Sequence, residues 1–145
     1  MEIENILFNK NSIHEDDVEI IQLLSSHPNQ DISATELKLL LDNNLSNTGW
    51  LVPYKYSPQL KTTIKAVRDK TGLCLPLGNI ARLFYDLLKM QYCYNVEVIN
   101  RGIIICPIKP IGNKAYLNRL DRELSVYKKV INIPLCGIGV NIKES

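Results

Sequence analysis

Three basic residues, Lys61, Lys65 and Arg68, are spaced by four and three positions within the segment Ser57–Thr71. If that segment is a helix, this spacing brings the three side chains onto one face. Basic side chains on one face can neutralise the phosphates of a nucleic acid, which releases condensed counterions and makes binding depend on salt. A competing interpretation, an ordinary solvated lysine face, stays open.

Further residues extend this candidate binding set. Arg101 precedes Gly102 and is expected at the tip of a hairpin, from which its side chain could reach a phosphate. In a later apolar helix, Arg82 and Asp86 are four positions apart and are expected to pair with each other. The nucleic-acid-binding residues predicted from the sequence are therefore Lys61, Thr62, Lys65, Arg68, Lys89, Arg101 and Lys114.

Motifs of common enzymes are absent from the sequence. There is no G-x-x-x-x-G-K-[ST], G-x-G-x-x-G or G-x-S-x-G pattern, and Gly137-Ile138-Gly139 leaves no room for a following helix. Hydrolytic nucleases hold magnesium with an acid pair followed by x-Lys, and Glu97, which is followed by two apolar residues, does not fit that pattern. The sequence predicts no catalytic residue, no cofactor, no metal and a protein that is not an enzyme.

Two other groups of reactive side chains have structural explanations. Glu15, Asp16 and Asp17 fall in the first turn of a predicted helix, where carboxylates favour the helix dipole, so we do not interpret them as a metal site. The four cysteines lack the close pairs of a zinc site and have apolar neighbours, which is typical of buried thiols. A disulfide between Cys93 and Cys106 across a hairpin stays open.

Charge is divided unevenly along the 145 residues. Residues 1–47 carry nine acids against two lysines, a net −7, and residues 48–145 carry fifteen basic residues against six acids, a net +9. Such asymmetry suggests a polyanion as the partner of the basic part, or a matched protein as the partner of the acidic part. The length predicts a single domain, 1–145, with possible sub-units 1–110 and 111–145. No signal peptide or membrane-spanning run is recognisable, and we expect a cytoplasmic protein with no membrane partner.

Capping signals and apolar spacing predict the elements that position these residues. Ser33 and Glu36 form a capping box, and Pro58 and Gly72 delimit the basic segment. The expected elements are helices over 14–26, 33–43, 57–71, 79–90 and 113–129, a hairpin over 92–109, and a strand or short hairpin over 130–143.

This order of helices followed by a hairpin resembles the winged helix-turn-helix family of nucleic-acid-binding domains over about Ile32 to Lys109. The resemblance implies a recognition helix in the DNA major groove and a wing against phosphate or the minor groove. The connection over 44–56 is longer than that of a tight helix-turn-helix, which leaves open whether 57–71 or 79–90 is the recognition helix. The expected fold class is α+β and mainly helical, a winged-helix-like unit with a β-hairpin, plus a C-terminal helix and strand.

Two functions follow as expectations. The first is a small DNA-binding regulator or accessory factor in replication, partition or mobile-element biology, with double-stranded DNA as its partner. The alternative is a protein-interaction module, an adaptor, inhibitor or assembly subunit with an acidic N-terminal docking surface. A homodimer through Leu117, Leu120, Leu124 and Tyr127 is possible, although a helix docked on its own domain is favoured. A ligand pocket near the aromatic residues Trp50, Tyr54 and Tyr56 is the weakest candidate.

Overall fold

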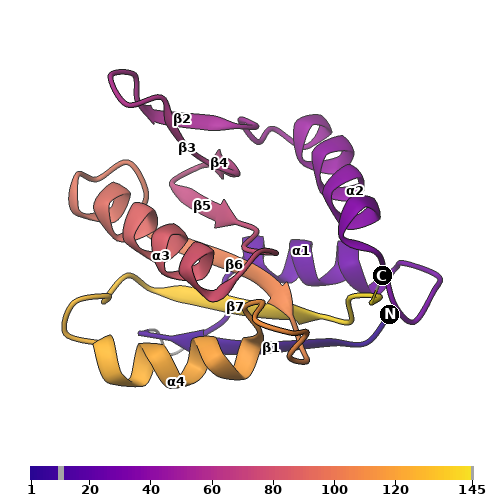
Figure 1. The fold of residues 1–145 in the computed structure, drawn as a ribbon. Helices are drawn as coiled ribbons and strands as arrows, with labels where there is room; N and C mark the ends of the chain where they lie inside the picture. Colours follow the sequence, from indigo (N-terminus) through magenta and orange to yellow (C-terminus); the bar gives the residue numbers. More distant parts are fainter. Residues whose placement is uncertain (10–11, 145) are drawn as a thin grey trace.

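The computed structural model describes residues 1–9 and 12–144. A five-stranded mixed sheet in the order β1-β7-β6-β5-β4 forms the centre, and a two-stranded hairpin, β2-β3, rises from one end of it (Figure 1). The strands β5, β6 and β7 are parallel, while β1 and β4 are antiparallel edges. The elements are β1 Ile3–Phe8, α1 Glu15–Ser25, α2 Ala34–Asn47, β2 Tyr54–Ser57, β3 Thr62–Ile64, β4 Ala66–Arg68, β5 Thr71–Cys74, α3 Ile80–Asn95, β6 Arg101–Pro107, α4 Leu117–Tyr127 and β7 Leu135–Val140.

Helices cover both faces of the sheet, and the side chains of β6 show how. Ile103 and Ile105 pack into the core under α1 and α2, whereas Ile104 and Cys106 pack into the core under α3 and α4. A strand buried on both faces between parallel neighbours has a continuous apolar sequence. The predicted hairpin over 92–109 is therefore wrong: its first part ends α3, and its second part is the single central strand β6.

The predicted helix over 57–71 is also wrong, since the structure forms β2, β3, β4 and β5 there. Lys61, Asp69 and Lys70 have positive φ angles, which a right-handed helix does not allow. Asp69 and Lys70 form the two-residue turn between β4 and β5, and positive φ at both positions is the geometry of a tight hairpin turn. Gly72, expected to end a helix, lies inside β5.

The last helix, α4, docks on its own sheet. Leu117, Leu120 and Leu124 are buried in the core, which leaves only Tyr127 of the four proposed dimer residues exposed. A Cβ on Gly137 of β7 would lie 3.0 Å from Leu120 and 3.2 Å from Leu117, so the missing side chain is what lets α4 approach β7 closely. The Gly-Ile-Gly stretch thus has a packing role in the structure.

The fold class is α+β with a mixed five-stranded sheet and four helices among the described residues, and the prediction of a mainly helical winged-helix-like unit is wrong. The predicted helices over 14–26, 33–43, 79–90 and 113–129 correspond to α1, α2, α3 and α4. The sheet takes strands from both predicted sub-units, because β7 lies between β1 and β6. None of the helices within residues 1–9 and 12–144 has the length and apolar character needed to cross a membrane.

Candidate nucleic-acid interface

A polar pocket of about 190 Å³ lies where the end of β5 meets the start of α3. We call it the β5–α3 pocket. Basic residues reach it from three elements: Lys38 from α2, Lys65 from the link between β3 and β4, and Arg82 from the first turn of α3. We call these three residues the pocket cations. The remaining lining residues are Pro53, Thr63, Ile64, Cys74, Leu75 and Asp86.

Asp86, which lines this pocket, and Asp42, which bonds to the lining residue Lys65, are each paired with a base. Lys65 donates to Asp42 of α2, and Arg82 Nε donates to Asp86 Oδ1 at 3.2 Å, as the spacing of four positions predicts. Lys89 Nζ lies 3.9 Å from the same Asp86 oxygen. The three pocket cations and Lys89 therefore outnumber the two carboxylates, and the pocket has an excess of positive charge.

Asp86 is the most buried charged group of this pocket, with 2% of its surface exposed. Burial raises the pKa of its carboxyl, and the charges of Arg82 and Lys89 oppose that rise. Its second oxygen, Oδ2, has no hydrogen-bond partner within the part of the chain that the structure describes. Asp86 thus holds two basic side chains in place and has a free acceptor oxygen.

Lys89 connects α3 with the β2-β3 hairpin. Its Nζ donates to the carbonyl of Thr63 at 3.1 Å and lies 4.2 Å from the centre of the Tyr85 ring, a cation–π contact. Only 10% of the Lys89 side chain is exposed, so its main role is to hold α3 against the hairpin rather than to extend into solvent.

A second cluster, which we call the Asp16 cluster, contains two of the residues predicted to bind nucleic acid, Arg68 and Arg101. Arg68 Nη2 donates to Asp16 at 2.7 Å and also to Glu19, and its guanidinium lies 4.8 Å from the centre of the Trp50 ring. Arg101 Nη2 is 3.8 Å from Asp16, and the hydroxyl of Thr71 donates to the same carboxylate. Burial raises the pKa of Asp16, but the bonds from Thr71 and Arg68 outweigh it and hold that pKa below its ordinary value.

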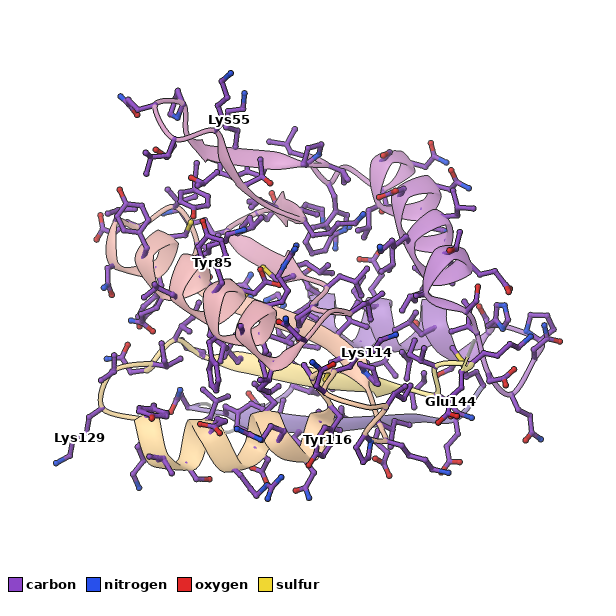
Figure 2. The ribbon with its side chains drawn as sticks, in the orientation of Figure 1. Lys55, Tyr85, Lys114, Tyr116, Lys129 and Glu144 are labelled. Carbon is purple, nitrogen blue, oxygen red and sulfur yellow. The ribbon has the colours of Figure 1, made fainter. Side chains whose placement is uncertain are left out.

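The seven predicted residues therefore do not form one surface. Lys65 lines the β5–α3 pocket together with Asp86, and Lys89 lies 3.9 Å from Asp86, whereas Arg68 and Arg101 meet at Asp16. Lys61 is exposed in the turn between β2 and β3, and Thr62 begins β3. Lys114 lies just before α4, far below the hairpin residue Lys55 in Figure 2.

Sequence reasoning missed Lys38, and it missed that Arg82, whose side chain is 56% exposed, lines this pocket. Lys38 belongs to a Glu36-Leu37-Lys38 stretch that matches the E-x-K pattern, but this stretch is on α2 and Glu36 bonds to the capping residue Ser33. Across the described residues, no group of three His, Cys, Asp or Glu side chains is placed to hold a metal ion. All four cysteines are buried and none of them forms a disulfide, so Cys93 and Cys106 are not bonded to each other.

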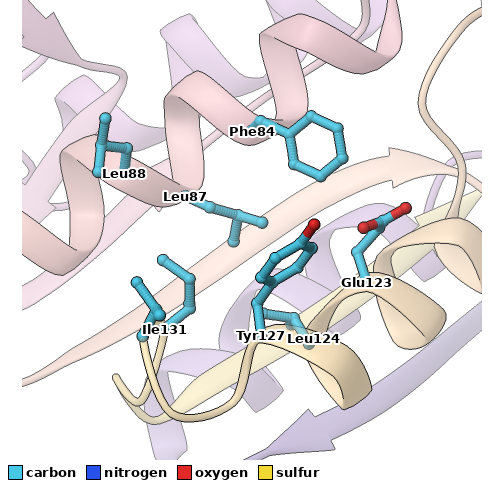
Figure 3. A pocket seen from close by; sticks show the side chains of 8 residues that line it. Phe84, Leu87, Leu88, Glu123, Leu124, Tyr127 and Ile131 are labelled. Carbon is cyan, nitrogen blue, oxygen red and sulfur yellow. The ribbon is translucent and has the colours of Figure 1, made fainter.

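An apolar groove of about 320 Å³ between α3 and α4 contrasts with this pocket. Figure 3 shows Phe84, Leu87 and Leu88 of α3 facing Tyr127 and Ile131 across it. Glu123 is the one charged residue among the described residues of its lining, and a carboxylate repels an anion. A phosphate group is therefore better matched by the β5–α3 pocket than by this groove.

Comparisons with known proteins agree with this fold. The chain superimposes on a crystal structure of restriction endonuclease BglII complexed with a DNA 16-mer, with a TM-score of 0.78 and 16% sequence identity over 99% of this chain and 78% of that one. It superimposes on free BglII with a TM-score of 0.67 and 15% identity over 100% of this chain and 81% of that one. No curated protein matches the sequence.

The family comparison is decisive, because the model of the family "Restriction endonuclease BglII/BglIII" matches residues 2–140. Two expectations from the sequence are corrected by it. The likeness to winged helix-turn-helix domains is wrong, and so is the expectation that the protein is not an enzyme, because the family consists of endonucleases. The chain belongs to the BglII/BglIII restriction endonuclease family.

Proposed function

We propose that this chain binds double-stranded DNA and acts in the restriction of DNA, in place of the regulatory role expected from the sequence. The observation that carries the proposal is the β5–α3 pocket, in which three basic side chains from separate elements meet in a chain of an endonuclease family. A related fold, that of BglII, is known in complex with a DNA 16-mer. Hydrolysis of a DNA phosphodiester is the reaction that the family name implies and is the activity to assay.

The charge distribution supports the same proposal. Residues 48–145 carry a net charge of +9, and this part supplies Lys65 and Arg82. Lys55 and Lys61 extend the positive charge along the exposed β2-β3 hairpin, which rises above the pocket (Figures 1 and 2). Positive charge in this arrangement steers a polyanion toward the pocket.

The Asp16 cluster weakens the alternative of an acidic docking surface. Asp16 and Glu19 bind Arg68 within the same chain, so they are not free to meet a basic partner. For the same reason we assign Arg68 and Arg101 to the fold, while Lys61, Lys65 and Lys89 remain in the proposed DNA-binding set together with Lys38 and Arg82.

Fluorescence anisotropy with a labelled duplex of about 16 base pairs tests this proposal, with the salt concentration varied. The double variant Lys38→Ala, Arg82→Ala should bind at least about tenfold more weakly, and the slope of log K against log salt should fall by about 0.9 for each phosphate that the variant no longer neutralises. Lys128→Ala with Lys129→Ala is the matched control, because it removes two exposed positive charges beyond the end of α4. Equal losses of affinity in both double variants, or no duplex binding at low salt, would refute the proposal.

A further inference from the structure

The family name implies a metal-dependent reaction, so the residues of the β5–α3 pocket must be compared with what a magnesium ion needs. Mg²⁺ is bound through oxygen ligands, commonly one or two carboxylates together with water and phosphate. The carboxylates within reach are Asp42 and Asp86, and both are paired with basic side chains. The end of β5 contributes a buried thiol, Cys74, followed by the apolar residues Leu75 and Pro76. These residues do not fit the metal.

The charge of the β5–α3 pocket also disfavours a metal ion. A divalent cation entering the pocket would meet the three pocket cations and Lys89, against two acids that these bases already neutralise. The metal would have to displace Arg82 and Lys89 from Asp86, a carboxylate with 2% of its surface exposed, before it could use that group as a ligand. An anion meets no such obstacle, since the pocket has an excess of positive charge.

We propose that the β5–α3 pocket binds a DNA backbone phosphate directly, through Lys38, Lys65 and Arg82, and without a divalent metal ion. The identity of the ligand as a DNA phosphate rests on the proposed function, whereas the anion site itself rests on the pocket. The basic side chains take over the charge neutralisation that a metal ion supplies in a metal-dependent nuclease.

Each pocket cation has hydrogen-bond donors that are available for a phosphate. The Lys65 ammonium has three donors and uses one on Asp42, which leaves two for phosphate oxygens. Arg82 binds Asp86 through Nε, and its two terminal nitrogens can form the paired hydrogen bonds that guanidinium makes with phosphate. Lys38 is exposed and lines the pocket from α2, so its ammonium can donate to a phosphate from a third side. Asp86 is a positioning residue that orients Arg82 and Lys89.

Inorganic phosphate is the probe that separates this inference from the proposed function. In EDTA, titration of the ¹⁵N-labelled protein with phosphate should shift the backbone amides of Cys74 and Leu75 saturably. The double variant Lys65→Met, Arg82→Met should raise the dissociation constant at least about tenfold, and Lys128→Met with Lys129→Met should leave it unchanged. Thermal melting checks the folding of each variant, and the single variant Lys38→Met, at an exposed position, replaces the pocket double variant if the latter does not fold.

Manganese provides the opposite test. We expect added MnCl₂ to cause no saturable, selective broadening of the amides around Asp86. Selective broadening that Asp86→Asn removes would overturn the inference, as would phosphate binding that requires Mg²⁺, or Mg²⁺-dependent cleavage of a duplex that Asp86→Asn abolishes.

Measuring duplex binding alongside phosphate binding distinguishes failure of the proposed function from failure of this inference. Phosphate binding in EDTA without binding of the duplex would refute the proposed function and leave the anion site standing. Duplex binding that depends on Mg²⁺ would refute the inference and leave the proposed function standing. Binding of both probes in EDTA, with loss of both in the pocket double variant, supports the two together.

Discussion

Arg68 is predicted from the sequence to bind phosphate, but the structure gives it a different role that a single substitution can test. Its guanidinium joins β4 to α1 through Asp16 and Glu19, and 18% of the side chain is exposed. Replacing Arg68 with Met keeps a long apolar side chain and removes the charge. Asp16, whose side chain is 7% exposed, would then keep the Thr71 hydroxyl, Arg101 at 3.8 Å and the His14 imidazole at 3.5 Å.

The expected cost follows from these contacts. Breaking a buried ion pair by removing one partner costs about 3–5 kcal/mol, because a buried charge is left behind. Asp16 keeps these three neighbours, and the pair of Arg68 with Glu19, which is 43% exposed, is worth at most about 1 kcal/mol, so we expect the low end of that range. Arg68→Met should therefore destabilise the protein by about 3 kcal/mol, which lowers the melting temperature by about 6–12 °C for a chain of this length.

Urea denaturation and thermal melting measure this change, and Arg122→Met is the control. Arg122 is exposed and makes one hydrogen bond to the Tyr116 hydroxyl, so its loss should cost no more than about 0.5 kcal/mol. The double variant Asp16→Asn, Arg68→Met should be less destabilised than the sum of the single variants. Duplex affinity of Arg68→Met should stay within about twofold of the original protein, as expected if Arg68 serves the fold.

Acid provides a further check on the same cluster. The pKa of Asp16 is lowered in the folded protein, so its contribution to stability is present above the unfolded pKa near 3.8 and is lost as pH falls through the folded value. Arg68→Met removes part of the cause of that lowering and should show a smaller loss of stability between neutral pH and pH 3. Equal stability of the variant and the original protein, or a large loss of duplex affinity in the variant, would refute the structural role of Arg68.

Three further predictions concern packing, capping and thiol reactivity. Gly137→Ala places a Cβ 3.0 Å from Leu120 and should cost about 1–3 kcal/mol in the free energy of unfolding, while Gly78→Ala, with its nearest contact at 3.7 Å, should cost less than about 1 kcal/mol. Ser33→Ala removes the oxygen that accepts from the Glu36 amide and should cost about 1 kcal/mol, measured by urea denaturation. A thiol reagent at pH 8 should label no cysteine in the folded protein and four after denaturation, because burial raises the pKa of Cys93 to about 11 and that of Cys106 to about 12.

Local signals in the sequence predicted α1, α2, α3 and α4, although not the absence of a helix over 57–71. Ser33 accepts from the Glu36 amide at 3.1 Å as the capping box requires, and the carboxylates before Val18 occupy the first turn of α1. Arg82 and Asp86 pair as their spacing predicts. These features depend on residues within one helical turn of each other, and a sequence pattern records them directly.

The sheet could not be predicted in the same way, because its strands are stabilised by distant partners. Ile103–Cys106 reads equally well as one arm of a hairpin or as a central strand, and β5 and β7 decide between the two. The segment 57–71 has helical periodicity, yet pairing of β4 with β5 outweighs that local preference. The pocket depends on the same long-range order: Lys65 meets Arg82 and Lys38 only after β5 and α2 are in place.

A DNA backbone phosphate held in the β5–α3 pocket is the arrangement that the proposed function and the anion site predict when both are taken together. A crystal structure of the protein with a 16-base-pair duplex, grown in EDTA, measures this directly. We predict a phosphate oxygen at hydrogen-bond distance, about 2.7–3.2 Å, from the Lys65 ammonium or the Arg82 guanidinium, with Asp86 still bonded to Arg82. A duplex bound on another face, or a pocket that accepts DNA only with a metal ion bound to Asp86, would contradict this placement of the DNA.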